Sequence, residues 1–163
     1  MLLYDGAGRE LVARLKYRNG RSALGWLADG MAALIPVAER TAIDVVTWAP
    51  TTRKRAATRG FDQAELLARR VASRLGVCCQ RLLERRASPP QTGRDAAARR
   101  IGPVFTVRGV VNDGRVLVVD DVVTTGATVA AAAAALRGAG ARTASVVAAA
   151  RTPLKISADA TDA

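Results

Sequence analysis

The 163-residue sequence contains no histidine, and its only two cysteines are the neighbours Cys78 and Cys79. Zinc sites need histidine or cysteine ligands at characteristic spacings, so this composition excludes the usual zinc-binding patterns. Two adjacent cysteines also do not form the disulfide framework of a small secreted protein. The chain lacks any Gly-Lys pair as well, which excludes the phosphate-binding loop of the P-loop nucleotidases.

Aromatic residues make up only 4% of the chain, although 50% of its residues are hydrophobic. Valine, leucine, isoleucine and alanine must therefore fill the core. No apolar run reaches the roughly 18 residues that a membrane-spanning helix needs. The first residues lack the charged region and the cleavage site of a signal peptide. We therefore expect a cytoplasmic protein without a membrane span.

Acidic residues are outnumbered, with 14 Asp and Glu against 25 Lys and Arg, and the net charge is +11. Such a balance favours anionic partners, either nucleic acid or a phosphorylated ligand. A general richness in alanine and arginine explains the same charge as a solvated surface. The charge alone therefore does not choose between these interpretations.

The most informative stretch runs from Val116 to Thr128 and combines three features. The four aliphatic residues Val116–Val119 predict a strand that is buried on both faces. The acids Asp120 and Asp121 follow, where we expect this strand to end. A Thr-Thr-Gly-Ala-Thr turn then leads into an alanine-rich helix, whose N-terminal N–H groups can bind phosphate. The pattern predicts a site for a ligand with hydroxyls and a phosphate, and the alternative is a turn whose threonine only caps the helix.

Other segments alternate between helical and strand patterns, which predicts an α/β fold with a parallel sheet. The expected further helices span residues 8–18, 22–34 and 64–75, and the expected further strands span residues 43–49, 77–79 and 143–150. The side chains expected to face the core from the second and third of these helices are Leu24, Leu27, Met31, Leu34, Leu66, Leu67, Val71 and Leu75. Asp62 is expected to cap the helix 64–75.

Two further loops are rich in basic residues. The loop after strand 43–49 contains four cations, Arg53, Lys54, Arg55 and Arg59, and is placed either to bind a diphosphate or simply to be solvated. Residues 82–102 are rich in arginine, proline and glycine, and long irregular loops of this kind are functional lids or disordered. We therefore predict one domain over residues 1–151, with residues 82–102 as a mobile loop and residues 152–163 as a disordered tail.

The Val116–Thr128 stretch resembles the phosphoribosyl pyrophosphate (PRPP) signature of the type I phosphoribosyltransferases. Combined with Lys16-Tyr17, with Arg59-Gly60-Phe61-Asp62-Gln63, with Gln91 followed by Arg99, and with Phe105, it resembles the ComF (competence protein F-like) family over residues 8–151. That family has Asn where this chain has Asp62 and Gly102. The resemblance implies a type I phosphoribosyltransferase-like fold, which is a Rossmann-like parallel sheet flanked by helices in a single domain.

The resemblance also implies roles for individual residues. Asp120 and Asp121 would hold the ribose hydroxyls as the catalytic acids. The 5-phosphate would bind to Thr124, Thr125, Gly126, Ala127 and Thr128. The pyrophosphate would bind to Thr51, Thr52, Arg53 and Arg59. Gln91 and Arg99 would lie in the mobile loop that covers PRPP.

Two functions follow from this resemblance. The first is transfer of the phosphoribosyl group of PRPP to an unknown acceptor, with release of pyrophosphate. Mg²⁺ would assist this transfer, carried by PRPP without direct protein ligands. The second is a non-catalytic role in natural competence, with single-stranded DNA or the competence machinery as partner. Many ComF-like proteins begin with a Cys-x-x-Cys zinc module, and this chain starts after its position, so we expect no zinc here. A homodimer remains an open alternative to a monomer.

Overall fold

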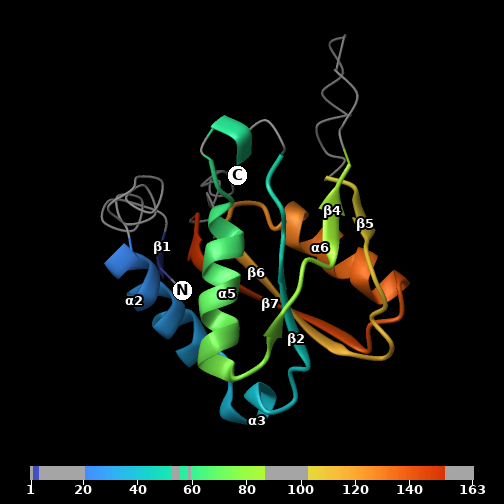
Figure 1. Ribbon diagram of the computed structural model, residues 1–163, viewed down its shortest axis with the longest axis horizontal. Coiled ribbons are helices and arrows are strands. Elements are labelled where there is room, and N and C mark those ends of the chain that lie inside the picture. The colour runs from blue at the N-terminus through green and yellow to red at the C-terminus, as the bar shows by residue number, and fades with distance from the viewer. Residues whose placement is uncertain (1, 4–20, 53–55, 59, 87–102, 153–163) are drawn as a thin grey trace, which may run out of the picture.

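A parallel sheet of five strands, in the order β1-β7-β6-β2-β3, forms the centre of the computed structural model (Figure 1). The structure describes residues 2–3, 21–52, 56–58, 60–86 and 103–152. The strands of this sheet are β1 (Leu2–Leu3), β2 (Val45–Trp48), β3 (Cys78–Cys79), β6 (Arg115–Val123) and β7 (Thr143–Arg151). All neighbouring strands in it run parallel, so the predicted α/β class is confirmed.

Helices cover both faces of this sheet. On one face lie α2 (Arg21–Ala33) and α5 (Gln63–Leu75), and on the other lies α6 (Ala127–Gly138) (Figure 1). The short α3 (Val37–Arg40) leads from α2 toward β2. No helix among the described residues is long and apolar enough to cross a membrane.

The central strand β6 contributes to two separate parts of the core, because successive side chains of a strand point to opposite faces. Leu117 and Val119 pack in the cluster that α2 and α5 cover. Val116 and Val118 pack in the cluster that α6 covers. All four side chains are at most 1% exposed, which confirms that this strand is buried on both faces.

Two of the leucines predicted to face the core are instead at the surface. Leu34 is 50% exposed, because α2 ends at Ala33. Ile35, the residue after Leu34, enters the core in its place. Leu66 is 36% exposed, since the buried side of α5 is the one that carries Leu67 and Val71. The other predicted core positions of these two helices are buried or pack against the core cluster: Leu24, Leu27, Met31, Leu67, Val71 and Leu75.

The predicted loop 82–102 is wrong at its beginning. Leu83–Arg85 form strand β4, which pairs antiparallel with β5 (Phe105–Val107) in a second, two-stranded sheet. Leu83 is completely buried, so burial against the α6 side of the core orders this segment. Helix 8–18, the remainder of the predicted mobile loop at residues 87–102 and the tail 153–163 lie outside the described residues.

Candidate functional site

The carboxyl ends of β2 and β6 meet at one edge of the sheet. Trp48 at the end of β2 is paired with Val119 in β6, and the N–H of Ala49 donates to the Val119 carbonyl at 3.1 Å. The chain that follows β2 therefore emerges beside Asp120 and Asp121. In open α/β sheets this edge is where ligands bind.

The two acids lie within β6, not after it. The strand continues to Val123 because β7 runs beside it, with Asp120 opposite Ala148 and Val122 opposite Ala150. The prediction that the strand ends at Val119 is therefore wrong by four residues. By strand alternation Asp120 lies on the α6 side of the sheet and Asp121 on the α5 side, so the pair presents one carboxyl to each face.

Asp120 is a buried carboxyl with only 7% of its surface exposed. Its Oδ1 accepts a hydrogen bond of 2.8 Å from the Asp121 N–H. Burial raises the pKa of Asp120 to about 8, and the negative charges of Asp121 and, more weakly, Asp62 add to this effect. At neutral pH the unliganded Asp120 is therefore mainly protonated and can donate a hydrogen bond as well as accept one.

The predicted phosphate loop joins β6 to α6. Gly126 caps the helix in the left-handed conformation, with φ of 82°, and its carbonyl accepts from the Ala130 N–H at 2.9 Å. The nearest side-chain acceptor for the first turn is Thr125 Oγ1, 3.4 Å from the Ala127 nitrogen, which is a weak contact. First-turn N–H groups of a helix lack intrahelical partners and attract anions.

A small pocket opens between this loop and the buried acid. It contains about 170 Å³ of empty space, part of it open to solvent. Its lining consists of Asp120, Val122, Val123, Thr124, Gly126, Thr128 and Val129. The structure thus brings Asp120 together with three residues of the predicted phosphate loop, Thr124, Gly126 and Thr128.

The family model for the phosphoribosyl transferase domain matches residues 61–162, which include the acid pair and the phosphate loop. The chain belongs to this family. No curated protein matches the chain.

Three of these structures have the same fold at low sequence identity. A purine phosphoribosyltransferase from Pyrococcus horikoshii is 19% identical, with a TM-score of 0.53 over 82% of this chain and 76% of that one. Glutamine PRPP amidotransferase from B. subtilis is 24% identical, with a TM-score of 0.58 over 85% of this chain. The allosteric regulatory enzyme of purine biosynthesis is 22% identical, with a TM-score of 0.57, again over 85% of this chain. The chain spans only 30% of the length of the last two.

The structure describes the predicted pyrophosphate loop only in part. Thr51 and Thr52 lie directly after the buried Pro50, and the Thr52 carbonyl accepts from the Ala56 N–H at 2.9 Å, which starts a helical turn. The other residues predicted to contact the ligand, Arg53, Arg59, Gln91 and Arg99, lie outside the described residues. Thr51 and Thr52 thus lie just after the carboxyl end of β2, and their contact with pyrophosphate stays a prediction.

Asp62 is a carboxylate of the site that sequence reasoning recognised only as a helix cap. The cap is confirmed, since Asp62 Oδ1 accepts from the Ala64 N–H at 3.1 Å. Its Oδ2 accepts from the Thr51 N–H at 2.9 Å, so it also contacts the loop after β2. Burial raises the pKa of Asp62, and the charges of Asp121 and Glu65 act in the same direction. The signal available in the sequence was its position, since the N-terminus of α5 follows the loop that leaves the carboxyl end of β2.

Among the described residues, no cluster of side chains could bind a metal ion by itself. No three His, Cys, Asp or Glu residues there form a group that could hold an ion. Mg²⁺ in proteins keeps several waters and is commonly bound through substrate phosphates and one or two carboxylates. Mg²⁺ carried by the diphosphate of the ligand stays a prediction from the sequence.

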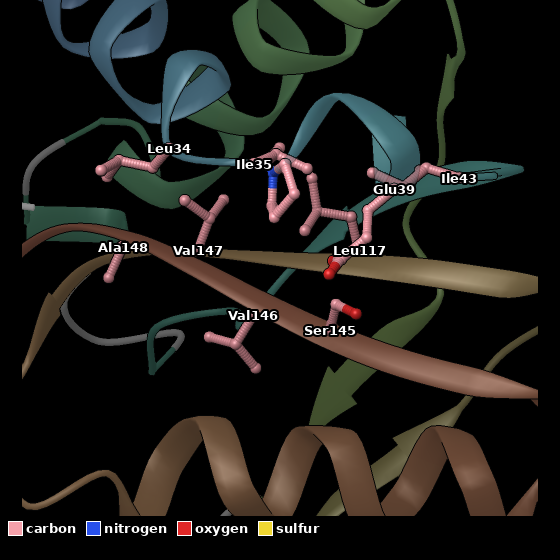
Figure 2. A pocket seen from close by; sticks show the side chains of 10 residues that line it. Leu34, Ile35, Glu39, Ile43, Leu117, Ser145, Val146, Val147 and Ala148 are labelled. Atoms are coloured by element: carbon pink, nitrogen blue, oxygen red, sulfur yellow. The ribbon is translucent and has the colours of Figure 1, made fainter. Parts of the chain in front are cut away.

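A larger pocket lies away from the acids, on the side of the sheet that α2 covers. It holds about 550 Å³ of empty space, including space open to solvent. Figure 2 shows Val147 rising from β7 toward the segment with Leu34 and Ile35. Its lining is mainly apolar, with Glu39 as its acidic group, and includes neither Asp120 nor Asp121. It therefore lacks the polar groups that would recognise a ribose phosphate.

Substitution of Gly126 by alanine is expected to destabilise the phosphoribosyl transferase domain by about 1–2 kcal/mol, because an L side chain strains a left-handed backbone. A Cβ there would meet no atom within 4 Å, so strain and not a clash causes the effect. Urea unfolding measures it, with Gly30→Ala inside α2 as control. Gly30 has ordinary φ and open space, so that control should gain stability. Equal effects of the two substitutions would contradict the role of the Gly126 backbone.

Proposed function

We propose that the domain binds PRPP at the carboxyl edge of β6 and transfers its phosphoribosyl group to an acceptor with release of pyrophosphate. The observation that carries the proposal is the direct connection of an acid pair in β6 to the N-terminus of α6. The pocket between them is polar at the buried Asp120 and at the threonines of the loop. Such a site offers hydrogen-bonding groups for hydroxyls next to N–H groups for a phosphate.

Within this proposal the ribose lies over the end of β6 and its 5-phosphate points to the helix. The carboxyls of Asp120 and Asp121 accept hydrogen bonds from the ribose hydroxyls. Thr124, Thr125, Gly126, Ala127 and Thr128 surround the 5-phosphate. The helix dipole of α6 adds a favourable interaction with the dianion.

The diphosphate then extends toward the end of β2, where Thr51 and Thr52 lie. The bond between C1 of the ribose and the pyrophosphate oxygen breaks, and its electron pair leaves with pyrophosphate. The acceptor forms the new bond to C1 and loses its proton to water. Positive charge develops on the ribose in this step, and a carboxylate beside the ring stabilises it. Mg²⁺, when bound to the diphosphate, neutralises part of its charge.

The named relatives support the choice of substrate. A purine phosphoribosyltransferase and a glutamine PRPP amidotransferase share the fold, and the first of them matches most of its own length. The family model covers the acid pair and the phosphate loop together. A non-catalytic role of the ComF type in single-stranded DNA uptake stays a second prediction from the sequence resemblance. The cytoplasmic location and the homodimer also stay predictions.

Calorimetric titration of the full chain with PRPP and MgCl₂ tests the proposal. We expect saturable binding at one site per chain, and weaker binding of ribose 5-phosphate, which lacks the diphosphate. Incubation of the PRPP complex with a panel of nucleobases should release pyrophosphate with at least one of them. If neither PRPP nor ribose 5-phosphate binds, the proposed function is wrong. If PRPP binds and no nucleobase releases pyrophosphate, the transfer step to a base is wrong and the binding site remains.

A further inference from the structure

The side chain of Asp62 closes a loop at the edge of the site. Its two carboxyl oxygens have different partners on the two sides of this loop. Oδ1 accepts from the Ala64 N–H in the first turn of α5, and Oδ2 accepts from the Thr51 N–H just after β2. The two hydrogen bonds, of 3.1 and 2.9 Å, therefore tie the beginning of the loop 51–62 to its end.

We propose that Asp62 is a positioning residue that holds the beginning and the end of this loop together. It thereby sets where the diphosphate half of the substrate binds relative to Asp121. The inference rests on the proposed function, because it names the substrate of the same site. Thr51 and Thr52 are the described residues placed to meet the diphosphate, and Thr51 is the residue that Asp62 holds through its backbone. The position of Asp62 thus controls the pyrophosphate side and leaves the 5-phosphate side at α6 unaffected.

Helix capping alone does not require an aspartate at this place. Asparagine, serine and aspartate cap helices about equally well, because each supplies one acceptor to the first turn. Only a carboxylate supplies a second acceptor for the Thr51 N–H, since an asparagine side chain would present an N–H₂ donor to that donor. The half-buried carboxylate also faces the charges of Asp121 and Glu65, which disfavour its ionised form. The second hydrogen bond explains why a charged group occupies a position where an uncharged cap would suffice.

A charge at Asp62 also acts on the acid pair. Its charge is one of the causes that raise the pKa of Asp120, after burial and the larger effect of Asp121. Removing this charge lowers the pKa of Asp120, so the acid pair ionises at a lower pH. This effect acts through space, so the pH dependence of binding reports the charge of Asp62, and the ratio of the affinities for PRPP and ribose 5-phosphate reports its hold on the loop.

The experiment compares Asp62→Asn and Asp62→Ser with the unsubstituted chain, using PRPP with MgCl₂ and, separately, ribose 5-phosphate. Both substitutions keep a cap for α5 and lose the acceptor for Thr51. Above pH 8, where Asp120 is ionised in all three chains, we expect the affinity for PRPP to fall roughly tenfold, or about 1.4 kcal/mol, and that for ribose 5-phosphate to stay within about twofold. The pH midpoint of ribose 5-phosphate binding should shift to lower pH in both variants.

Glu65→Gln serves as the matched control. Glu65 lies in the first turn of α5, its charge also acts on Asp62, and its carboxylate pairs with Arg69 and not with Thr51. This variant should leave the ratio of the two affinities unchanged.

The outcomes separate the two proposals. An equal loss of both affinities in the Asp62 variants would reduce Asp62 to a helix cap and overturn the inference. The same holds if neither affinity changes. Absence of binding by the unsubstituted chain would instead overturn the proposed function on which the inference rests.

Discussion

Replacement of Asp120 by asparagine is expected to make the unliganded domain more stable at pH 8, by about 2–4 kcal/mol. The reason is the buried carboxyl, whose pKa is raised from 3.8 to about 8, first by burial and then by the neighbouring charge of Asp121. Asparagine is neutral at every pH and keeps an oxygen that can accept from the Asp121 N–H. It therefore removes the energetic penalty of ionising or protonating this group.

The sign follows from proton binding in the two states. Between about pH 4 and pH 8 the folded state holds a proton on Asp120 that the unfolded state has released. Stability therefore falls as the pH rises through this window and levels off above pH 8. The gain from Asp120→Asn should accordingly be near zero at pH 4 and largest at pH 8. Urea unfolding at a series of pH values measures it.

A control substitution has the opposite expected sign. Asp29 is exposed, and its hydrogen bond with Arg74 lowers its pKa. Its contribution to stability is present above its ordinary pKa and is lost as the pH falls, so Asp29→Asn should slightly destabilise the domain at pH 8. If Asp120→Asn were destabilising at pH 8, or if its effect did not depend on pH, the raised pKa of Asp120 would be refuted.

The double substitution Asp120→Asn with Asp121→Asn is expected to weaken PRPP binding by at least about 100-fold. Hydrogen bonds to charged groups contribute about 1.5–3 kcal/mol each, and above pH 8, where Asp120 is ionised, this variant removes both carboxylates that we assign to the ribose hydroxyls. Calorimetric titration with PRPP and MgCl₂ measures the change. Inorganic phosphate, which needs only the N-terminus of α6, should keep its affinity within about threefold.

Loss of two negative charges could by itself strengthen the attraction of a polyanion to a chain of net charge +11. The matched control is therefore Asp29→Asn with Asp113→Asn, which makes the same change in net charge at two exposed ion pairs, with Arg74 and Arg142. We expect that control to bind PRPP as tightly as the unsubstituted chain or slightly better. Unchanged PRPP binding in the Asp120 and Asp121 variant would refute the assignment of the ribose site.

Local patterns in the sequence were sufficient to predict the elements that carry the site. The aliphatic run Val116–Val119 predicted a central strand because a strand covered on both faces has no polar positions. The glycine and the alanines after it predicted α6, and the structure begins this helix at Ala127 after the cap Gly126. These features depend on residues a few positions apart, which is the range over which sequence patterns act.

Features that depend on distant partners were not predictable in the same way. Strand β6 continues through the acids because β7, more than 20 residues later, pairs with them. Strand β4 was not predicted, and it exists because β5 lies beside it, with Leu83 paired to Val107 far along the chain. The hydrogen bond from Thr51 to Asp62 likewise joins residues whose separation along the chain gives no pattern. In each case tertiary contact decides a structure that the local sequence leaves open.

The placement of Asp120 and Asp121 on opposite faces of β6 has a consequence for how the interior responds to a ligand. The two apolar clusters are separated by the sheet, one beneath α5 and the other beneath α6. A small molecule held by both acids touches the rim of each cluster at once. Its binding energy then opposes local unfolding of either cluster. Amide protons beneath both layers of helices should therefore become protected against hydrogen exchange together.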